Sequence, residues 1–206
     1  MQKEEKNTQN GGAAESFSPR RRLRRDLAVF GNLRALCMAA MLAAMAVVLG
    51  YLAKLLFGTG PFRITFENLP IIFGGLLFGP FMGATMAVVA DLCSCLFSGQ
   101  APYPLISLGT MTIGLVSGFL GNYLLRRRRF WQLLLITLAT HTLGSMLIKS
   151  FALYTMGYAW VTLLPRIPVY IAIACCEAAA MRVLFHNHHL MALADRLFAT
   201  EGRRRK

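Results

Sequence analysis

Long apolar segments restrict the fold of this chain more than any other feature. A helix that crosses a bilayer needs about 20 mostly apolar residues. The chain is 56% hydrophobic with a mean hydropathy of +0.52, which is more apolar than a soluble domain needs to be. We therefore expect an all-α integral membrane protein with six transmembrane helices, over residues 35–57, 69–78, 81–97, 105–125, 131–154 and 164–185.

The second of these segments is too short to span the membrane alone. It is followed directly by Gly79-Pro80, and proline cannot continue the hydrogen-bond ladder of a helix. We expect a short or tilted helix that turns sharply at this dipeptide into the third helix.

The distribution of basic residues indicates the orientation of the helices. The net charge is +13, and of 22 lysines and arginines eight precede residue 35, four lie at 126–129 and six lie from residue 182 onward. With six spans these clusters share one face, which the positive-inside rule makes cytoplasmic. The charge then reflects topology and contact with anionic lipids, not nucleic acid. We expect a disordered basic cytoplasmic tail over 1–32, a membrane domain over 33–185 and a basic cytoplasmic tail over 186–206.

The remaining basic residues, Lys54, Arg63, Lys149 and Arg166, fall on or near the opposite, outer side. For Lys54 we favour simple snorkelling to the outer headgroups, and Lys149 could do the same. Arg63 and Arg166 are harder to explain in this way, because basic residues are otherwise scarce on this side.

Polar side chains also occur at regular spacing inside the apolar segments. Helical spacing places the members of each group on one helix face. At about 1.5 Å per residue, Asp91 and His141 each lie roughly 15 Å into their helices, where an ionisable residue is costly unless it has a function. We predict a pocket that opens to the outside, with cations at its mouth and these two residues at its floor. The groups are Thr137, His141, Ser145 and Lys149 in the fifth segment, and Arg166, Tyr170 and Glu177 in the sixth.

Other interpretations of these residues remain open. Asp91 could pair with His141 as a structural bridge instead of contacting a ligand. Glu177 lies too deep for an outer pocket, and we expect it to bond to a neighbouring helix. A proton relay through all three is conceivable. The five cysteines lie in apolar segments without metal-ligand spacing, so we interpret them as small core residues and expect no metal site.

The first apolar segment contains a stripe of alanines. Ala35, Ala39 and Ala43 follow each other at steps of four, with Ala40 and Ala44 beside them. Such small-xxx-small stripes let a second helix approach closely. Ordinary packing inside the bundle explains the stripe equally well.

Several motifs together resemble the substrate-binding S components of energy-coupling factor (ECF) vitamin transporters, and most of all the folate group. The resemblance covers roughly residues 33–185. The motifs are Arg63-Ile64-x-Phe66-x-x-Leu69-Pro70, Gly75-Leu76-Leu77-Phe78-Gly79-Pro80 followed by Gly83, Ala90-Asp91-Leu92, and Arg166-Ile167-Pro168.

The resemblance implies a six-helix protein of the bacterial cell membrane with both termini cytoplasmic. S components of this kind bind one vitamin from outside and associate with a membrane scaffold, the T component, and with two ATPase subunits. The alanine motif of the first helix docks on the T component. This chain has no GxxxxGK[ST] phosphate loop, so we expect no enzymatic activity and no cofactor of its own, with ATP used by the partner subunits.

Folate would suit the predicted pocket. Its glutamate tail carries two carboxylates, for which arginine is the preferred partner, and Arg63, Arg166 and Lys149 lie at a suitable depth. A carboxylate such as Asp91 could recognise the edge of the pterin by hydrogen bonding, while Tyr103 or Tyr158 could stack on its face. The candidate substrate-binding residues are Arg63, Asp91, Tyr103, His141, Lys149, Tyr158, Arg166 and Tyr170.

Two alternatives compete with folate binding. The chain could be an S component for another vitamin: anionic pantothenate fits a cationic mouth well, and thiamine fits it poorly. It could also be an intramembrane enzyme that acts on lipid or prenyl substrates, which generally needs clustered Asp or His for metal-bound phosphate. The acids here are scattered, and the His186, His188 and His189 group is more simply explained as part of a solvated tail.

Overall fold

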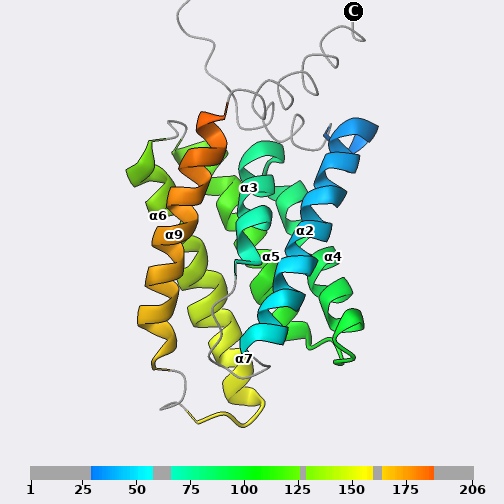
Figure 1. Ribbon diagram of the computed structural model, residues 1–206, viewed down its shortest axis with the longest axis vertical. Helices are drawn as coiled ribbons and strands as arrows, with labels where there is room; N and C mark the ends of the chain where they lie inside the picture. The colour runs from blue at the N-terminus through cyan, green and yellow to red at the C-terminus, as the bar shows by residue number, and fades with distance from the viewer. Residues whose placement is uncertain (1–28, 58–65, 126–128, 160–163, 188–206) are drawn as a thin grey trace, which may run out of the picture.

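The computed structural model describes residues 29–57, 66–125, 129–159 and 164–187, and these segments are helical apart from short turns. The helix over residues 130–155 is continuous but not uniform, since a π-helical segment interrupts its α-helix. The elements are the 3₁₀ turn η1 (Val29–Gly31), α2 (Leu33–Phe57), α3 (Asn68–Phe78), α4 (Pro80–Phe97), α5 (Pro104–Phe119) with the π-helical end η2 (Leu120–Leu124), α6 (Phe130–Thr140), π-helical η3 (His141–Ile148), α7 (Lys149–Thr155) and α9 (Arg166–His186) (Figure 1).

Five of these helical stretches are long and apolar enough to cross a membrane, and α3 is a shorter apolar helix. This confirms the prediction of six membrane helices with a short second one. The ends agree with the predicted segments to within a few residues; the last helix begins at Arg166 and not at residue 164.

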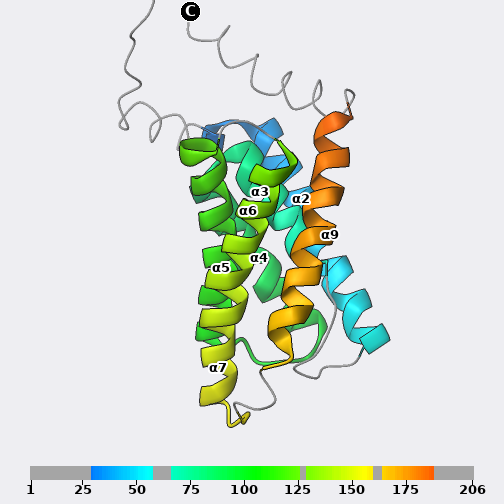
Figure 2. The same cartoon turned by 90° about the vertical axis from the view of Figure 1, so that its left-hand side faces the viewer.

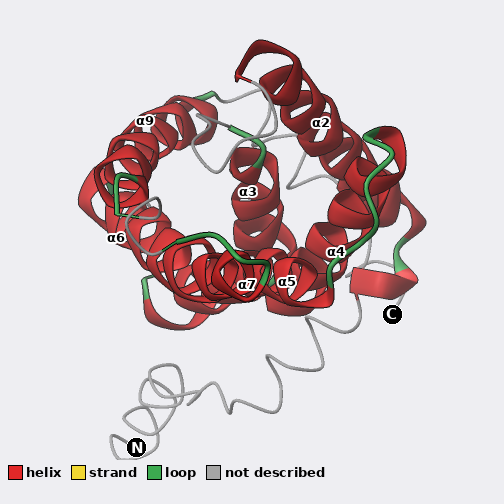
Figure 3. Ribbon diagram, turned by 90° about the horizontal axis from the view of Figure 1, so that it is seen from below, coloured by secondary structure: helices red, strands yellow, loops and turns green. Residues whose placement is uncertain are grey.

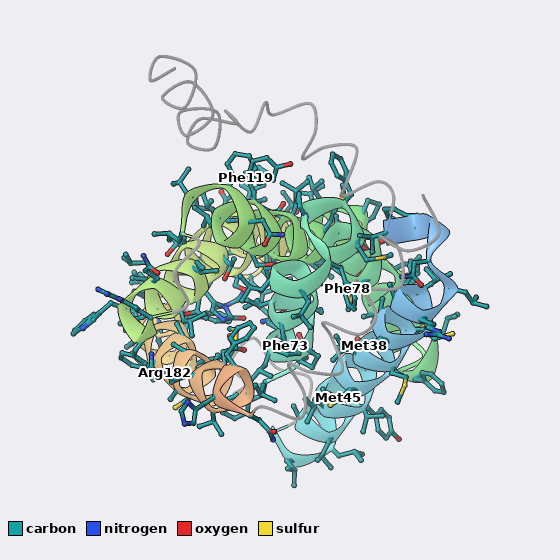
Figure 4. The ribbon with its side chains drawn as sticks, turned by 90° about the horizontal axis from the view of Figure 1, so that it is seen from above. Met38, Met45, Phe73, Phe78, Phe119 and Arg182 are labelled. Carbon is teal, nitrogen blue, oxygen red and sulfur yellow. The ribbon has the colours of Figure 1, made fainter. Side chains whose placement is uncertain are left out.

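The short helix α3 lies at the centre of the bundle. Figure 3 shows it enclosed by α2, α4, α5, the α6–α7 rod and α9. A helix that is apolar all round is typical of a protein core or a membrane span, and nine of the 11 residues of α3 are buried inside the bundle. Its aromatic side chains Phe73 and Phe78 point between the surrounding helices, whereas Phe119 of α5 points outward (Figure 4). Phe73 also packs on Phe185 of α9, with 5.2 Å between the ring centroids.

The turn between α3 and α4 has the predicted form. Gly79 has a φ of 100°, a region that glycine adopts without steric cost. Pro80 is the first residue of α4, where its missing N–H is not needed. The two residues together reverse the chain without a loop.

The alanine stripe of α2 divides into two faces. Ala35, Ala39 and Ala43 are at most 6% exposed and pack inside the bundle. Ala40 and Ala44 lie on the exposed face. The face that carries the first three is therefore used for packing inside the bundle, which was one of the two interpretations of the stripe. The docking role of the alanines stays a prediction.

Helices α4 and α5 approach each other through glycines. A Cβ atom on Gly83 would lie 2.6 Å from the carbonyl oxygen of Gly114 and 2.8 Å from Cα of Gly75. These neighbours are backbone atoms of helices, so they cannot move aside as a side chain would. Close backbone approach of this kind is how membrane helices gain packing contacts.

We predict that Gly83→Ala destabilises the bundle by about 1–3 kcal/mol, the usual cost of overpacking. Gly31→Ala is the matched control, because a Cβ there would meet nothing within 4 Å. Thermal unfolding in detergent, followed by circular dichroism, measures both. Equal melting temperatures for the two variants would contradict the close α4–α5 contact.

Candidate functional site

A cavity of about 460 Å³ opens at one end of the bundle. This is the end at which α2, α4 and α7 finish and α5 and α9 begin, at the bottom of Figures 1 and 2, whereas α3 begins nearer the middle of the bundle. The described arginines Arg34, Arg129 and Arg182 lie toward the opposite ends of their helices. The cavity therefore lies on the side that the charge distribution predicts to be outside.

Arg166 is the most constrained cation of this cavity. Its side chain is 5% exposed, and Nη2 donates to Tyr170 Oη at 3.0 Å. The guanidinium also lies over the Tyr170 ring, 5.3 Å from its centroid. The remaining nitrogens, Nε and Nη1, have no hydrogen-bond partner among the described atoms. Unpaired buried donors are costly, so this guanidinium is suited to bind the oxygens of an anion.

The other two cations of the cavity differ from each other. Lys149 lines it, and its ammonium makes no hydrogen bond to the described part of the chain, so it is available to a ligand. Lys54 also lines the cavity, but its ammonium donates to Ser98 Oγ at 2.6 Å and to Ser94 Oγ at 3.1 Å. The prediction that Lys54 snorkels to headgroups is therefore wrong: it joins the end of α2 to the end of α4.

Asp91 is the acid that α4 contributes to the wall. Ser107 Oγ donates to its Oδ2 at 2.5 Å and Thr110 Oγ1 to its Oδ1 at 3.3 Å. Both hydroxyls belong to α5, so they fix the carboxylate between the two helices. An ionised carboxylate has about four acceptor sites, and the others remain for a ligand that carries N–H groups.

His141 is not at the floor of the cavity. It is fully buried, and its Nε2 lies 2.7 Å from Oε2 of Glu177, which is also 0% exposed. The predicted bond from Glu177 to a neighbouring helix is confirmed, while the Asp91–His141 bridge is not formed. The physical reason is direction: His141 faces α9, and Asp91 faces α5. His141 reaches the cavity wall only through the ring of Tyr170, 5.4 Å away between centroids.

Tyrosines complete the wall. Tyr103 shares a hydrogen bond of 3.0 Å with Thr155 Oγ1, which joins the α4–α5 connection to the end of α7. Tyr158 and Tyr170 line the same cavity. Among the predicted site residues, Arg63 lies outside the described segments.

The sequence pattern did not single out Glu67 and Gln100, although both line the cavity. Glu67 precedes α3 directly, and its position at the outer end of the second apolar segment was the available signal. Gln100 lies in the connection between α4 and α5, where no periodicity indicates the direction of a side chain.

The fold and site together define a multi-pass membrane protein with a solute-sized cavity, lined by charged, polar and apolar side chains, at one end of a helical bundle. A sequence model of the family described as "ECF transporter, substrate-specific component" matches residues 34–193. This match covers most of the chain, which therefore belongs to that family of transporter S components.

One solved structure and one further sequence are also similar to this chain. The crystal structure of FolT bound with folic acid has a TM-score of 0.63 and 22% sequence identity, over 74% of this chain and 92% of that one. This likeness shows the fold. The "Uncharacterized protein MG098 homolog" of Mycoplasma pneumoniae (strain ATCC 29342 / M129 / Subtype 1) is 33% identical over 91 residues, or 44% of this chain. That stretch is 19% of the relative, so the chain spans about a fifth of its length.

Lys54 provides a test of the site's construction. We predict that Lys54→Met lowers the stability of the bundle by about 1–3 kcal/mol, because an ammonium with two serine acceptors is lost. Lys149→Met is the matched control at the same cavity: it removes a charge but no hydrogen bond, and its stem still packs on Gly109. Thermal unfolding of both variants without ligand measures the difference. An unchanged melting temperature for Lys54→Met would contradict the stabilising contact with α4 and would support the prediction that Lys54 extends to the lipid headgroups.

Proposed function

We propose that this S component binds folate from outside the cell and delivers it through a T component driven by two partner ATPases. The observation that carries the proposal is Arg166, a buried guanidinium with two unpaired nitrogens in the wall of a cavity. The likeness to FolT supports the choice of folate, because FolT was crystallised with folic acid bound.

The cavity's chemistry fits a ligand with two different ends. Arg166 and Lys149 supply donors for the carboxylates of a glutamate tail. Asp91, on α4, supplies an acceptor for a pterin edge, and Tyr103 and Tyr158 supply aromatic faces. The volume of about 460 Å³ lies within the range of ordinary small-molecule sites.

Membership of the family favours transport over the alternative of a lipid-modifying enzyme. In the proposed assembly the chain spans the plasma membrane with both termini in the cytoplasm. Ala40 and Ala44, which are exposed on α2, are then the alanines available to the T component. ATP is used by the partner subunits, and the chain itself needs no cofactor.

We predict that Arg166→Met weakens folic acid binding at least tenfold, since a charged hydrogen-bond donor to a carboxylate is lost. Arg63→Ala should act in the same direction, as the sequence predicts. Arg182→Met, on the exposed far end of the same helix as Arg166, is the control and should bind as the parent does. Isothermal titration calorimetry in detergent measures these affinities.

Three further titrations test the vitamin. Pantothenate, thiamine and riboflavin should not compete with folic acid at equal concentration. Competition by pantothenate alone would favour the alternative vitamin, and unchanged folic acid affinity in both arginine variants would remove the role of the cations.

The orientation of the cavity can be tested through Cys95, which lines it. In intact cells, a variant that retains only this cysteine should react with a membrane-impermeant thiol reagent, and folic acid should slow the reaction. A variant that retains only Cys93, which packs against the core, is the control and should not react. Labelling of Cys95 only after the cells are permeabilised would place the cavity on the cytoplasmic side.

A further inference from the structure

A chain of polar contacts leads from the cavity wall into the interior of the bundle. It begins at Arg166, whose guanidinium donates to and covers Tyr170. The Tyr170 ring contacts the ring of His141 with a tilt of 32°. His141 in turn lies 2.7 Å from Glu177. Arg166, Tyr170 and Glu177 belong to α9 at spacings of four and seven, so they share the face that packs on η3.

Burial of His141 and Glu177, at the inner end of this series of contacts, costs free energy. His141 and Glu177 are both 0% exposed, and Oε1 of Glu177 has no hydrogen-bond partner in the described structure. Buried ionisable pairs of this kind often contribute nothing to stability compared with apolar residues of similar volume. Stable packing of η3 on α9 therefore does not require an ionisable pair at these two positions.

We propose that His141 and Glu177 are positioning residues for Arg166, acting through Tyr170. The proposal rests on the proposed function, in which Arg166 binds the carboxylates of the ligand tail. It assigns the buried pair to ligand recognition even though neither residue lines the cavity.

The geometry explains how the position is transmitted. Both nitrogens of the His141 ring have partners, because Nδ1 lies 3.4 Å from Ser145 Oγ while Nε2 meets Glu177. The plane of the imidazole is therefore fixed. The fixed ring limits the rotation of the Tyr170 ring beside it.

Tyr170 then acts as the support for the guanidinium. Its hydroxyl accepts the hydrogen bond from Nη2 of Arg166, and its ring lies under the charge, where a cation–π contact adds attraction. With Nη2 held, Nε and Nη1 are the nitrogens that have no partner in the described structure, and the proposal assigns them to the ligand. Without a fixed Tyr170, the arginine loses rotamer order that ligand binding must restore.

A double-mutant cycle tests the coupling. The change His141→Leu with Glu177→Met replaces the pair by apolar side chains of similar volume, so the bundle should melt at or above the parent temperature. We expect about tenfold weaker folic acid binding when Arg166 is present, the loss of about one charged hydrogen bond. In an Arg166→Met background the same pair change should alter affinity less than about twofold.

Folic acid dimethyl ester provides a second readout. Its tail carries no charge for the guanidinium, so the parent and the pair variant should bind it equally. Thr140→Val is the control for core substitution, because Thr140 is fully buried but bonds only within its own helix; its folic acid affinity should match the parent. Tyr170→Phe keeps the ring and removes the acceptor of Arg166, and should weaken folic acid binding in the same direction as the pair change.

The outcomes separate the two proposals. An equal loss of affinity in both Arg166 backgrounds, or no loss in either, would overturn the positioning role while leaving folate binding intact. No folic acid binding by the folded parent would overturn the proposed function, and the role of the pair with it. A pair variant that fails to fold would assign these residues to the core and also overturn the proposal.

Discussion

The structure depends on burying one helix that is too short to cross the membrane. At about 1.5 Å per residue, the 11 residues of α3 extend about 16 Å, roughly half of a hydrocarbon core of about 30 Å. The helices around it are longer, so α3 occupies only part of the interior of the bundle. The space beyond its first residues, where Glu67 and Ile71 lie, is the cavity. A tight turn at Gly79 and glycine contacts between α4 and α5 hold α3 toward the other end of the bundle, so the cavity is a consequence of helix length.

The sequence predicted those features of the structure that depend on a single helix or turn. Span number, the reversal at Gly79-Pro80 and the inward direction of Glu177 all follow from hydropathy, turn chemistry and helical spacing. It did not predict features that depend on which other helix packs against a residue. Spacing puts His141 on a face of its helix but does not say that α9 lies there and α4 does not. The same limit applies to Lys54, whose serine acceptors are 40 and 44 residues away, and to the alanine stripe, which internal packing divides into a buried and an exposed face.

The charged residues of the cavity differ in how many hydrogen bonds they make within the protein. Lys54 and Asp91 are each held by two hydroxyls, so they are fixed in place before a ligand arrives. Arg166 is held at one nitrogen only, and Lys149 at none among the described contacts. Fixed groups provide specificity because they reject ligands whose polar atoms do not match. Groups with unused donors gain most from a ligand, so in the proposed function the anionic part of the ligand is bound mainly by α7 and α9.

The two sides of the cavity belong to parts of the bundle that pack by different means. On one side α3, α4 and α5 meet through glycines and backbone atoms, with Gly83 against Gly114. On the other, the α6–η3 segment meets α9 through polar contacts, including Thr137 Oγ1 to the carbonyl oxygen of Ala174 at 3.1 Å and the His141–Glu177 pair. The first part is held by contacts between backbone atoms, and the second is held by hydrogen bonds of side chains. In the proposed function the ligand joins Asp91 of α4 to Arg166 of α9. It would then connect these two parts, and its binding energy would act on the packing between them as well as on the cavity walls.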